Sequence, residues 1–182
     1  AIALDIAKSL GFRTSLDLIF GAPGENLQQW EQTVLQVIEL DPGHLSAYSL
    51  IVEPGTKLAR QISSGELADV DEDLQADKYE LADKLLTEAG YSWYEISNWS
   101  KSEDLKSNHN LAYWSGQDWW GYGPGAHSHL GSVRWWNHKH PLSYANLLEK
   151  NTSPAAGREQ LDSETAALER ILLESRTSEG MA

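Results

Sequence analysis

The chain has 182 residues, enough for one domain or a small pair of domains with a true hydrophobic core. Its 27 acidic residues outnumber 14 lysines and arginines, and the net charge of -13 argues against nucleic acid as a partner. Zero cysteines exclude disulfides, a thiolate nucleophile and a cysteine-held cluster within these residues. No apolar run reaches the ~20 residues of a membrane span, and no signal peptide is recognisable, so we expect a cytoplasmic protein.

Helix and strand patterns alternate through the first part of the chain. Apolar residues at a spacing of four predict a short helix over 2–10, and the apolar stretch 16–20 predicts a buried strand. A second helix is expected after Asn26, a good capping residue, and it ends at the sequence DPG, 41–43. Residues 44–52 read as the next buried strand. This alternation predicts βα units with parallel strands.

The pattern continues with a long helix from Asp71 to a glycine stop at Gly90, and a strand over 91–99. Beyond Ser100 no regular pattern predicts a helix or strand until two short helices, which are expected at 143–150 and 163–176. Because a closed eightfold barrel needs ~250 residues, any barrel here is partial. The sequence also begins inside a helical pattern without an initiator Met, so we expect it to be a piece of a longer protein.

One carboxylate stands out in the sequence DLIFGAPGEN, 17–26, where a glycine-rich turn follows the first predicted strand. The turn matches no phosphate-binding fingerprint, and Glu25 would repel a phosphate there. Asp17 is predicted to be buried in the strand, where two vicinal ribose hydroxyls would satisfy both carboxylate oxygens. The alternative is that Asp17 accepts hydrogen bonds from the backbone amides of a turn.

Residues 93–140 differ in composition from the rest of the chain. They contain seven of the eight tryptophans and five of the six histidines, with acidic and basic residues in balance. Such a segment is suited to a flat ligand. The alternatives remain open: neighbouring tryptophans such as 119–120 and 135–136 often pack in a core, and a histidine beside asparagines is often a hydrogen-bonding loop residue.

Several motifs occurring in a fixed order resemble the radical SAM proteins of the oxygen-independent coproporphyrinogen III oxidase family. The likeness covers roughly residues 1–150 and is strongest to the heme-chaperone branch, because HNLAYW matches its H-N-x-x-Y-W motif. The matching stretches are DLIFGAPGEN, LDPGHLSAYSLIVEPGT, YEISNW, HNLAYW, GYGPGAHSHL and RWWN, with a fainter match in ALERILLESRTSEG.

The resemblance implies an α/β fold: the C-terminal portion of a radical SAM partial TIM-type barrel, followed by a smaller α+β domain. It divides the chain into the last βα units of the barrel (1–92), an aromatic and histidine-rich region of the heme-chaperone type (93–150) and the start of a truncated helical domain (151–182). The family's cysteine motif is missing, so a [4Fe-4S] cluster is expected only in the full-length parent. The sequence also departs from the family at Glu25, where Gln is usual, and at Ala22, where Leu is common.

The resemblance also assigns the S-adenosyl-L-methionine contacts. Asp17 matches the family's ribose-binding aspartate. Ile51 falls at the end of the next predicted strand, where the family's backbone contacts the adenine, and Ile19 lies in the same strand as Asp17.

For heme, the resemblance makes His109 the candidate ligand of the iron, with Tyr113 and Trp114 of the same motif beside the macrocycle. A neutral imidazole is a common heme ligand, and aromatic rings stack on porphyrins. The propionates need cations, which Arg134 and Lys139 could supply.

Three functions follow. The first is a heme chaperone that binds heme and S-adenosylmethionine and delivers heme to an acceptor protein, with a membrane-associated acceptor left open. The alternative is an oxygen-independent coproporphyrinogen III oxidase that decarboxylates a porphyrinogen in porphyrin biosynthesis, although this chain alone is not expected to be active. The third is a plain interaction module. We also expect self-association through the open edge of the sheet.

Overall fold

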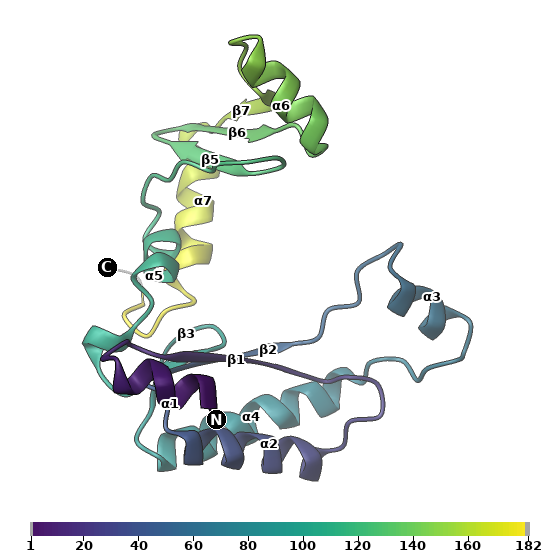
Figure 1. Ribbon diagram of the computed structural model, residues 1–182, viewed down its shortest axis with the longest axis vertical. Coiled ribbons are helices and arrows are strands. Elements are labelled where there is room, and N and C mark those ends of the chain that lie inside the picture. The colour runs from purple at the N-terminus through teal and green to yellow at the C-terminus, as the bar shows by residue number, and fades with distance from the viewer. Residues whose placement is uncertain (1, 181–182) are drawn as a thin grey trace. The chain divides into compact units, whose positions relative to one another are not determined.

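A computed structural model describes residues 2–180, which form two compact units that meet in sequence between Ser107 and Asn108 (Figure 1). The boundary differs from the three regions expected from the family, since the strands between residues 92 and 100 belong to the first unit. The division into 1–92, 93–150 and 151–182 therefore stays a proposal about functional regions.

The first unit contains a four-stranded mixed sheet. Its strands lie in the order β1-β2-β4-β3, with β1 and β2 parallel as predicted and the other pairs antiparallel. The predicted strand over 91–99 is wrong in one respect, because the chain reverses at Ser97, which has a positive φ of 68°, and forms a hairpin. The elements are α1 (Ile2–Ser9), β1 (Ser15–Phe20), α2 (Leu27–Leu40), β2 (His44–Ser49), α3 (Lys57–Ser63), α4 (Glu72–Glu88), β3 (Ser92–Glu95), β4 (Asn98–Ser100) and the 3-10 turn η1 (Glu103–Leu105).

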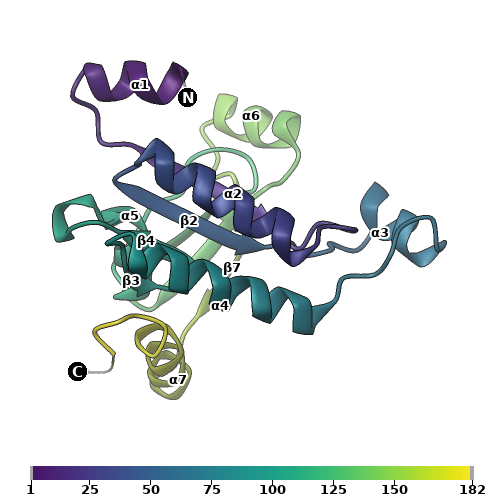
Figure 2. The ribbon, with the colours of Figure 1, turned by 90° about the horizontal axis from the view of Figure 1, so that it is seen from below.

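Helices α2 and α4 lie side by side on one face of this sheet (Figure 2). Both start as the sequence predicts: Asn26 and Gln29 form a capping box on α2, and Asp71 caps α4. Trp30 is fully buried between these helices and the sheet, and its indole N–H donates to the carbonyl oxygen of Lys78 at 2.8 Å. The core further comprises Phe20, Val34, Val37, Leu45, Ala47, Ala82, Leu86, Tyr91 and Trp99.

The prediction that the first strand is buried holds for only one of its faces. Leu16, Leu18 and Phe20 point towards the helices, whereas Asp17 and Ile19 alternate with them and are exposed. The physical reason is that α2 and α4 cover a single face of the sheet, so a strand with an apolar composition still presents every second residue to the surroundings.

The second unit contains a three-stranded antiparallel sheet in the order β5-β6-β7. The expectation of irregular structure from residue 100 to residue 143 is wrong, because one helix and two strands lie in that interval. The two predicted helices at 143–150 and 163–176 are confirmed with small shifts of their ends. The elements are α5 (Asn108–Trp114), β5 (His127–Leu130), β6 (Val133–Asn137), α6 (Pro141–Glu149), β7 (Ala155–Gln160) and α7 (Ser163–Glu174).

Candidate functional site

The open face of the first sheet carries Asp17 and Ile19. In register with them on β2 lie Ser46 and Tyr48, respectively. Within the described residues, the Asp17 carboxylate accepts no hydrogen bond, and the predicted burial of this group is wrong because α2 and α4 lie on the opposite face. Both oxygens of the carboxylate therefore remain available to hydroxyl donors.

Next to Asp17, the polar side chains of this face bind one another. The Ser46 hydroxyl donates to Asn98 Oδ1 at 2.7 Å, and Asn98 Nδ2 donates to the Tyr48 hydroxyl oxygen at 3.4 Å. Ser46 and Asn98 are buried, so these bonds fix both side chains. These hydrogen bonds give a fixed polar surface next to the carboxylate.

A second buried polar group lies at the start of β2. The ring nitrogens of His44 lie 2.7 Å from Ser15 Oγ and 2.7 Å from the Tyr94 hydroxyl. Burial lowers the pKa of His44, and the charge of Asp17 opposes this shift without cancelling it. Burial also raises the pKa of Tyr94 to about 12. Both rings are therefore neutral at pH 7.

The turn after β1 is held by an ion pair. Glu25 Oε2 accepts from the backbone N–H of Gly21 at 2.8 Å and from Lys78 Nζ at 2.9 Å, and Lys78 is only 1% exposed. The carboxylate of Glu25 thus occupies the place at which a phosphate loop would bind its anion. This supports the rejection of a phosphate site drawn from the sequence.

Gln75 of α4 joins the ends of the two parallel strands. Gly21 has a φ of 83°, and a Cβ built there would lie 2.5 Å from Gln75 Nε2, so the side chain fills the space that the glycine leaves. The same nitrogen donates to the carbonyl oxygen of Leu50 at 3.1 Å. Ile51 follows directly and is 73% exposed. Because β2 ends at Ser49, Ile51 lies beyond the strand and not at its end as predicted.

His109 lies in α5 and not in a loop, so the alternative of a loop histidine is wrong. The spacing of four residues places Tyr113 on the same side of the helix, and the two rings meet edge to face with centroids 4.9 Å apart. His109 and Tyr113 are exposed, whereas Trp114 is partly buried and makes none of the ring contacts that join the other aromatic residues nearby. The structure thus brings two of the three predicted heme residues together.

A hollow of about 280 Å³ lies beside Tyr113. The Tyr113 ring contacts Trp119, and Trp119 contacts the His129 ring, with centroid separations of 4.9 Å in both pairs. His129 Nδ1 is buried without a hydrogen-bond partner among the described residues, and the nearest Asp118 oxygen is 3.7 Å away. His129 lies two residues from His127 on β5, a strand that the sequence did not predict.

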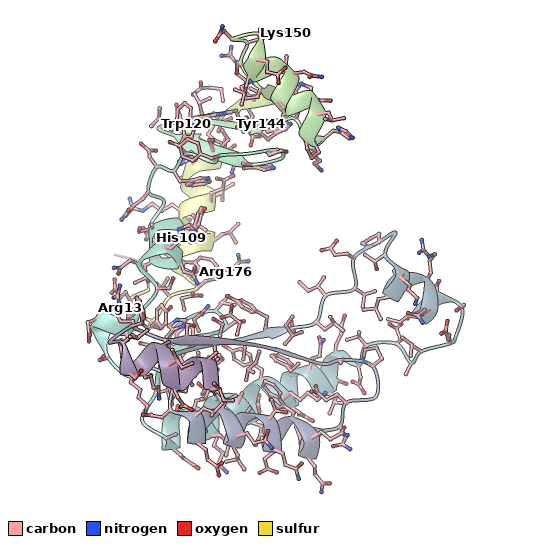
Figure 3. The ribbon with its side chains drawn as sticks, viewed as in Figure 1. Arg13, His109, Trp120, Tyr144, Lys150 and Arg176 are labelled. Atoms are coloured by element: carbon pink, nitrogen blue, oxygen red, sulfur yellow. The ribbon has the colours of Figure 1, made fainter. Side chains whose placement is uncertain are left out.

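The cation beside this hollow is not one that the sequence analysis selected. Arg134 lines the hollow but is held by Glu159 at 2.6 Å and Glu169 at 2.9 Å, and Lys139 does not line it. Arg176 lies just after α7 and is labelled in Figure 3. It lines the hollow, and its guanidinium has no ion pair or hydrogen bond among the described residues. Arg176 is 67 positions from His109 in the sequence, and no local motif could have linked them.

A multidentate metal site is absent from residues 2–180: no three or more His, Asp or Glu side chains are arranged to hold an ion. Since the chain has no cysteine, its own residues do not fit a [4Fe-4S] cluster. A heme needs only one or two axial ligands, and an exposed imidazole meets that need. Among the same residues, no helix is long and apolar enough to cross a membrane.

Comparison with known proteins identifies the relatives. No protein-family model matches the chain. The heme chaperone HemW of Mycobacterium tuberculosis strain H37Rv is 46% identical over 182 residues, which cover 100% of this chain and 46% of that protein. This chain is homologous to the HemW heme chaperones. HemW of Bacillus subtilis strain 168 is 34% identical over 177 residues, covering 97% of this chain and 46% of that protein. The chain therefore spans about half the length of these curated relatives.

A solved structure supports the fold. Coproporphyrinogen III oxidase (HemN) from Escherichia coli, described as a radical SAM enzyme, superposes with a TM-score of 0.74 and 22% identity, covering 91% of this chain and 41% of that chain. The predicted α/β class and the resemblance to this family, stated from HNLAYW and the linked motifs, are confirmed.

Proposed function

We propose that this chain is the part of a HemW-type heme chaperone that binds heme through His109 and contacts S-adenosylmethionine through Asp17. The observation that carries the proposal is the exposed His109 on α5, whose ring contacts Tyr113. Tyr113 in turn lines a hollow together with Arg176, whose guanidinium has no partner among the described residues. Similarity to HemW proteins, whose names state heme chaperone activity, supports the proposal, since it extends over 97–100% of this chain and 46% of those proteins.

Each group near His109 has a role in this proposal. The imidazole is the axial ligand of the heme iron. The hollow of about 280 Å³ is smaller than most sites that enclose a ligand, so it holds one edge of the macrocycle while the rest stays at the surface. Arg176 binds a propionate by a charge-assisted hydrogen bond. A heme held in this way can leave for an acceptor protein without unfolding of the unit, as delivery requires.

Asp17, Ile19 and Ile51 form the proposed S-adenosylmethionine contacts. The carboxylate of Asp17 accepts the two ribose hydroxyls, and the exposed isoleucines offer apolar surface to the adenosyl group. The ligand set of the [4Fe-4S] cluster must come from residues outside this chain, because the chain has no cysteine. S-adenosylmethionine supplies, when bound, the adenosyl group that characterises radical SAM proteins.

The heme proposal is tested by titrating hemin into the purified chain and recording the Soret band. His109→Ala is expected to weaken binding at least about tenfold and to shift the band, because the iron loses its axial ligand. The matched control is His140→Ala, which removes another exposed histidine of the same unit. Metal-free protoporphyrin IX should bind the wild type and His109→Ala alike. Identical hemin spectra and affinities for wild type and His109→Ala would remove His109 as the ligand.

The Asp17 contact is tested with adenosine and 2′-deoxyadenosine in calorimetric titrations. The wild type should prefer adenosine by about tenfold or more, because a hydrogen bond to a charged group contributes ~1.5–3 kcal/mol. Asp17→Asn should lose most of this preference, whereas Asp5→Asn, an exposed carboxyl of α1, should keep it. A wild-type chain that binds both nucleosides equally would contradict the assignment.

The oxidase alternative shares the fold, as the superposition with HemN supports. It is separated from the chaperone by activity of the whole protein with its cluster. Decarboxylation of coproporphyrinogen III would favour the oxidase, and transfer of bound heme to an apo-hemoprotein without decarboxylation would favour the chaperone.

A further inference from the structure

The sheet of the second unit has a different hollow on each face. Along β6, Arg134 lines the small hollow near Tyr113, whereas its neighbours Val133 and Trp135 line a groove of about 770 Å³. The groove also contains Trp120, and Trp119 beside it lines the small hollow. The two sites therefore share a sheet but no lining residue.

We propose that this groove, which α6 helps to line, binds a flat aromatic anion, with the rings against Trp120 and Trp135 and the acidic group at Arg158. The two indole rings meet at 74° with centroids 4.9 Å apart, so they form perpendicular walls. Trp120 is 59% exposed, which leaves its ring accessible to a ligand. Tyr144 and Leu148 of α6 also line the groove and contribute further aromatic and apolar surface. Figure 3 labels Tyr144 together with Trp120.

The polar groups of the groove favour a ligand with one acidic substituent. Arg158 pairs in register with Trp135, so its side chain lies on the groove face of the sheet. The guanidinium of Arg158 makes no ion pair or hydrogen bond with any other described residue, although the backbone of Arg158 pairs with β6. The Tyr144 hydroxyl and Asn137 are already engaged with the backbone of Gly123, at 3.2 and 3.0 Å. The guanidinium is thus the strongest unpaired donor in the groove.

The charge of the side chains that line the groove favours an anionic ligand. The chain carries a net charge of -13, yet among residues 2–180 no Asp or Glu lines the groove. An aromatic cation would meet no carboxylate there, whereas an anion meets one guanidinium. The volume lies within the ~300–1,000 Å³ typical of small-molecule sites. No histidine lines the groove, so this proposal is independent of the iron ligand at His109.

The probe is 1-anilinonaphthalene-8-sulfonate, a fluorescent aromatic anion, and 1-anilinonaphthalene is its neutral match. The wild type should bind one sulfonate per chain and prefer it to the neutral compound by about fivefold or more. Arg158→Gln should remove this preference without changing the affinity for the neutral compound. Trp120→Leu should weaken both probes by about tenfold, because it removes a stacking surface.

The matched control is Arg170→Gln, which deletes an exposed arginine of α7 and should leave both affinities unchanged. Far-UV circular dichroism and the urea midpoint identify any variant that has lost its fold. Arg158→Gln decides the outcome because the Arg158 side chain is exposed and makes no ion pair or hydrogen bond among the described residues. The proposal is overturned if Arg158→Gln keeps the preference, if Arg170→Gln loses as much, or if many probes bind per chain, as they do to loosely folded proteins.

Discussion

The two units of this protein use aromatic residues in opposite ways. In the first unit, Trp30 and Trp99 are fully buried in a continuous core beneath the sheet. Among described residues of the second unit, the buried ones are Ser128 and Asn137, both polar, while Trp120 is 59% exposed. Tryptophan therefore fills a core in the first unit, whereas in the second unit Trp120 presents an accessible ring and the other four tryptophans are only partly buried. Large accessible aromatic surfaces of this kind are typical of ligand or partner sites.

The difference between the two units is tested most directly by removing one tryptophan from each. Trp30→Ala should lower the free energy of unfolding by about 3–5 kcal/mol, because it empties a packed core. Trp120→Ala should lower it by about 1 kcal/mol or less, since an exposed ring loses mainly its contact with Trp135. Urea titrations followed by circular dichroism measure both. Equal losses would mean that the second unit has a core of the same kind.

The ion pair of the buried Lys78 with Glu25 is expected to stabilise the first unit. Lys78→Met should destabilise it by about 2–3 kcal/mol, because Glu25 keeps its charge and loses its partner. In a Glu25→Gln background the same change should cost clearly less, since Gln still accepts from the Gly21 amide without a buried charge. A double-mutant cycle by urea unfolding gives the coupling, and a coupling of zero contradicts the ion-pair role.

Mutating an equivalent helix cap in each unit should give a smaller change in the free energy of unfolding. Asp71 caps α4 and Asp162 caps α7, each accepting from a backbone N–H three residues on. Either change to Ala should cost about 1 kcal/mol. In hydrogen exchange, Asp71→Ala should lower the protection of amides throughout the core of unit 1. Asp162→Ala should lower protection only within α7, whose residues are not buried. Loss of protection throughout unit 2 in Asp162→Ala would show that its elements unfold together.

The smallest effect concerns pH. Because burial lowers the pKa of His44 below its ordinary value of 6.5, the unfolded chain takes up the proton first as the pH falls. The contribution of neutral His44 is fully present above pH 6.5 and is lost progressively below it. Urea unfolding at pH 8, 7, 6 and 5 should show a shallower decrease for His44→Gln than for the wild type. Parallel pH profiles would contradict this role.

Local patterns in the sequence predicted much of the first unit. The capping box at Asn26, the Asp71 cap and the apolar runs of β1 and β2 each lie within a few residues, so the helices and the parallel pair could be predicted. The β3-β4 hairpin could not, because a serine and not a glycine adopts the positive φ at its turn.

The second unit and the candidate sites show where local patterns fail. Trp135 and Trp136 point to opposite faces of β6, so apolar residues occupy both faces and no alternation marks the strand. Exposure of Asp17 depends on which sheet face the helices cover, a tertiary property. Similarly, the two glutamates that pair with Arg134 come from β7 and α7, so the sequence around Arg134 does not show that its guanidinium is already engaged.

Gln75 has a consequence for the proposed binding of an adenosyl ligand at Asp17 and Ile51. One amide group occupies the space above Gly21 and also holds the Leu50 carbonyl, so the gap between the Asp17 strand and the Ile51 segment is set by a third element, α4. Shortening this side chain would let the two strand ends drift independently. Affinity for the nucleoside would then fall although no contacting atom had been altered, because the entropic cost of aligning both ends would be met at the moment of binding.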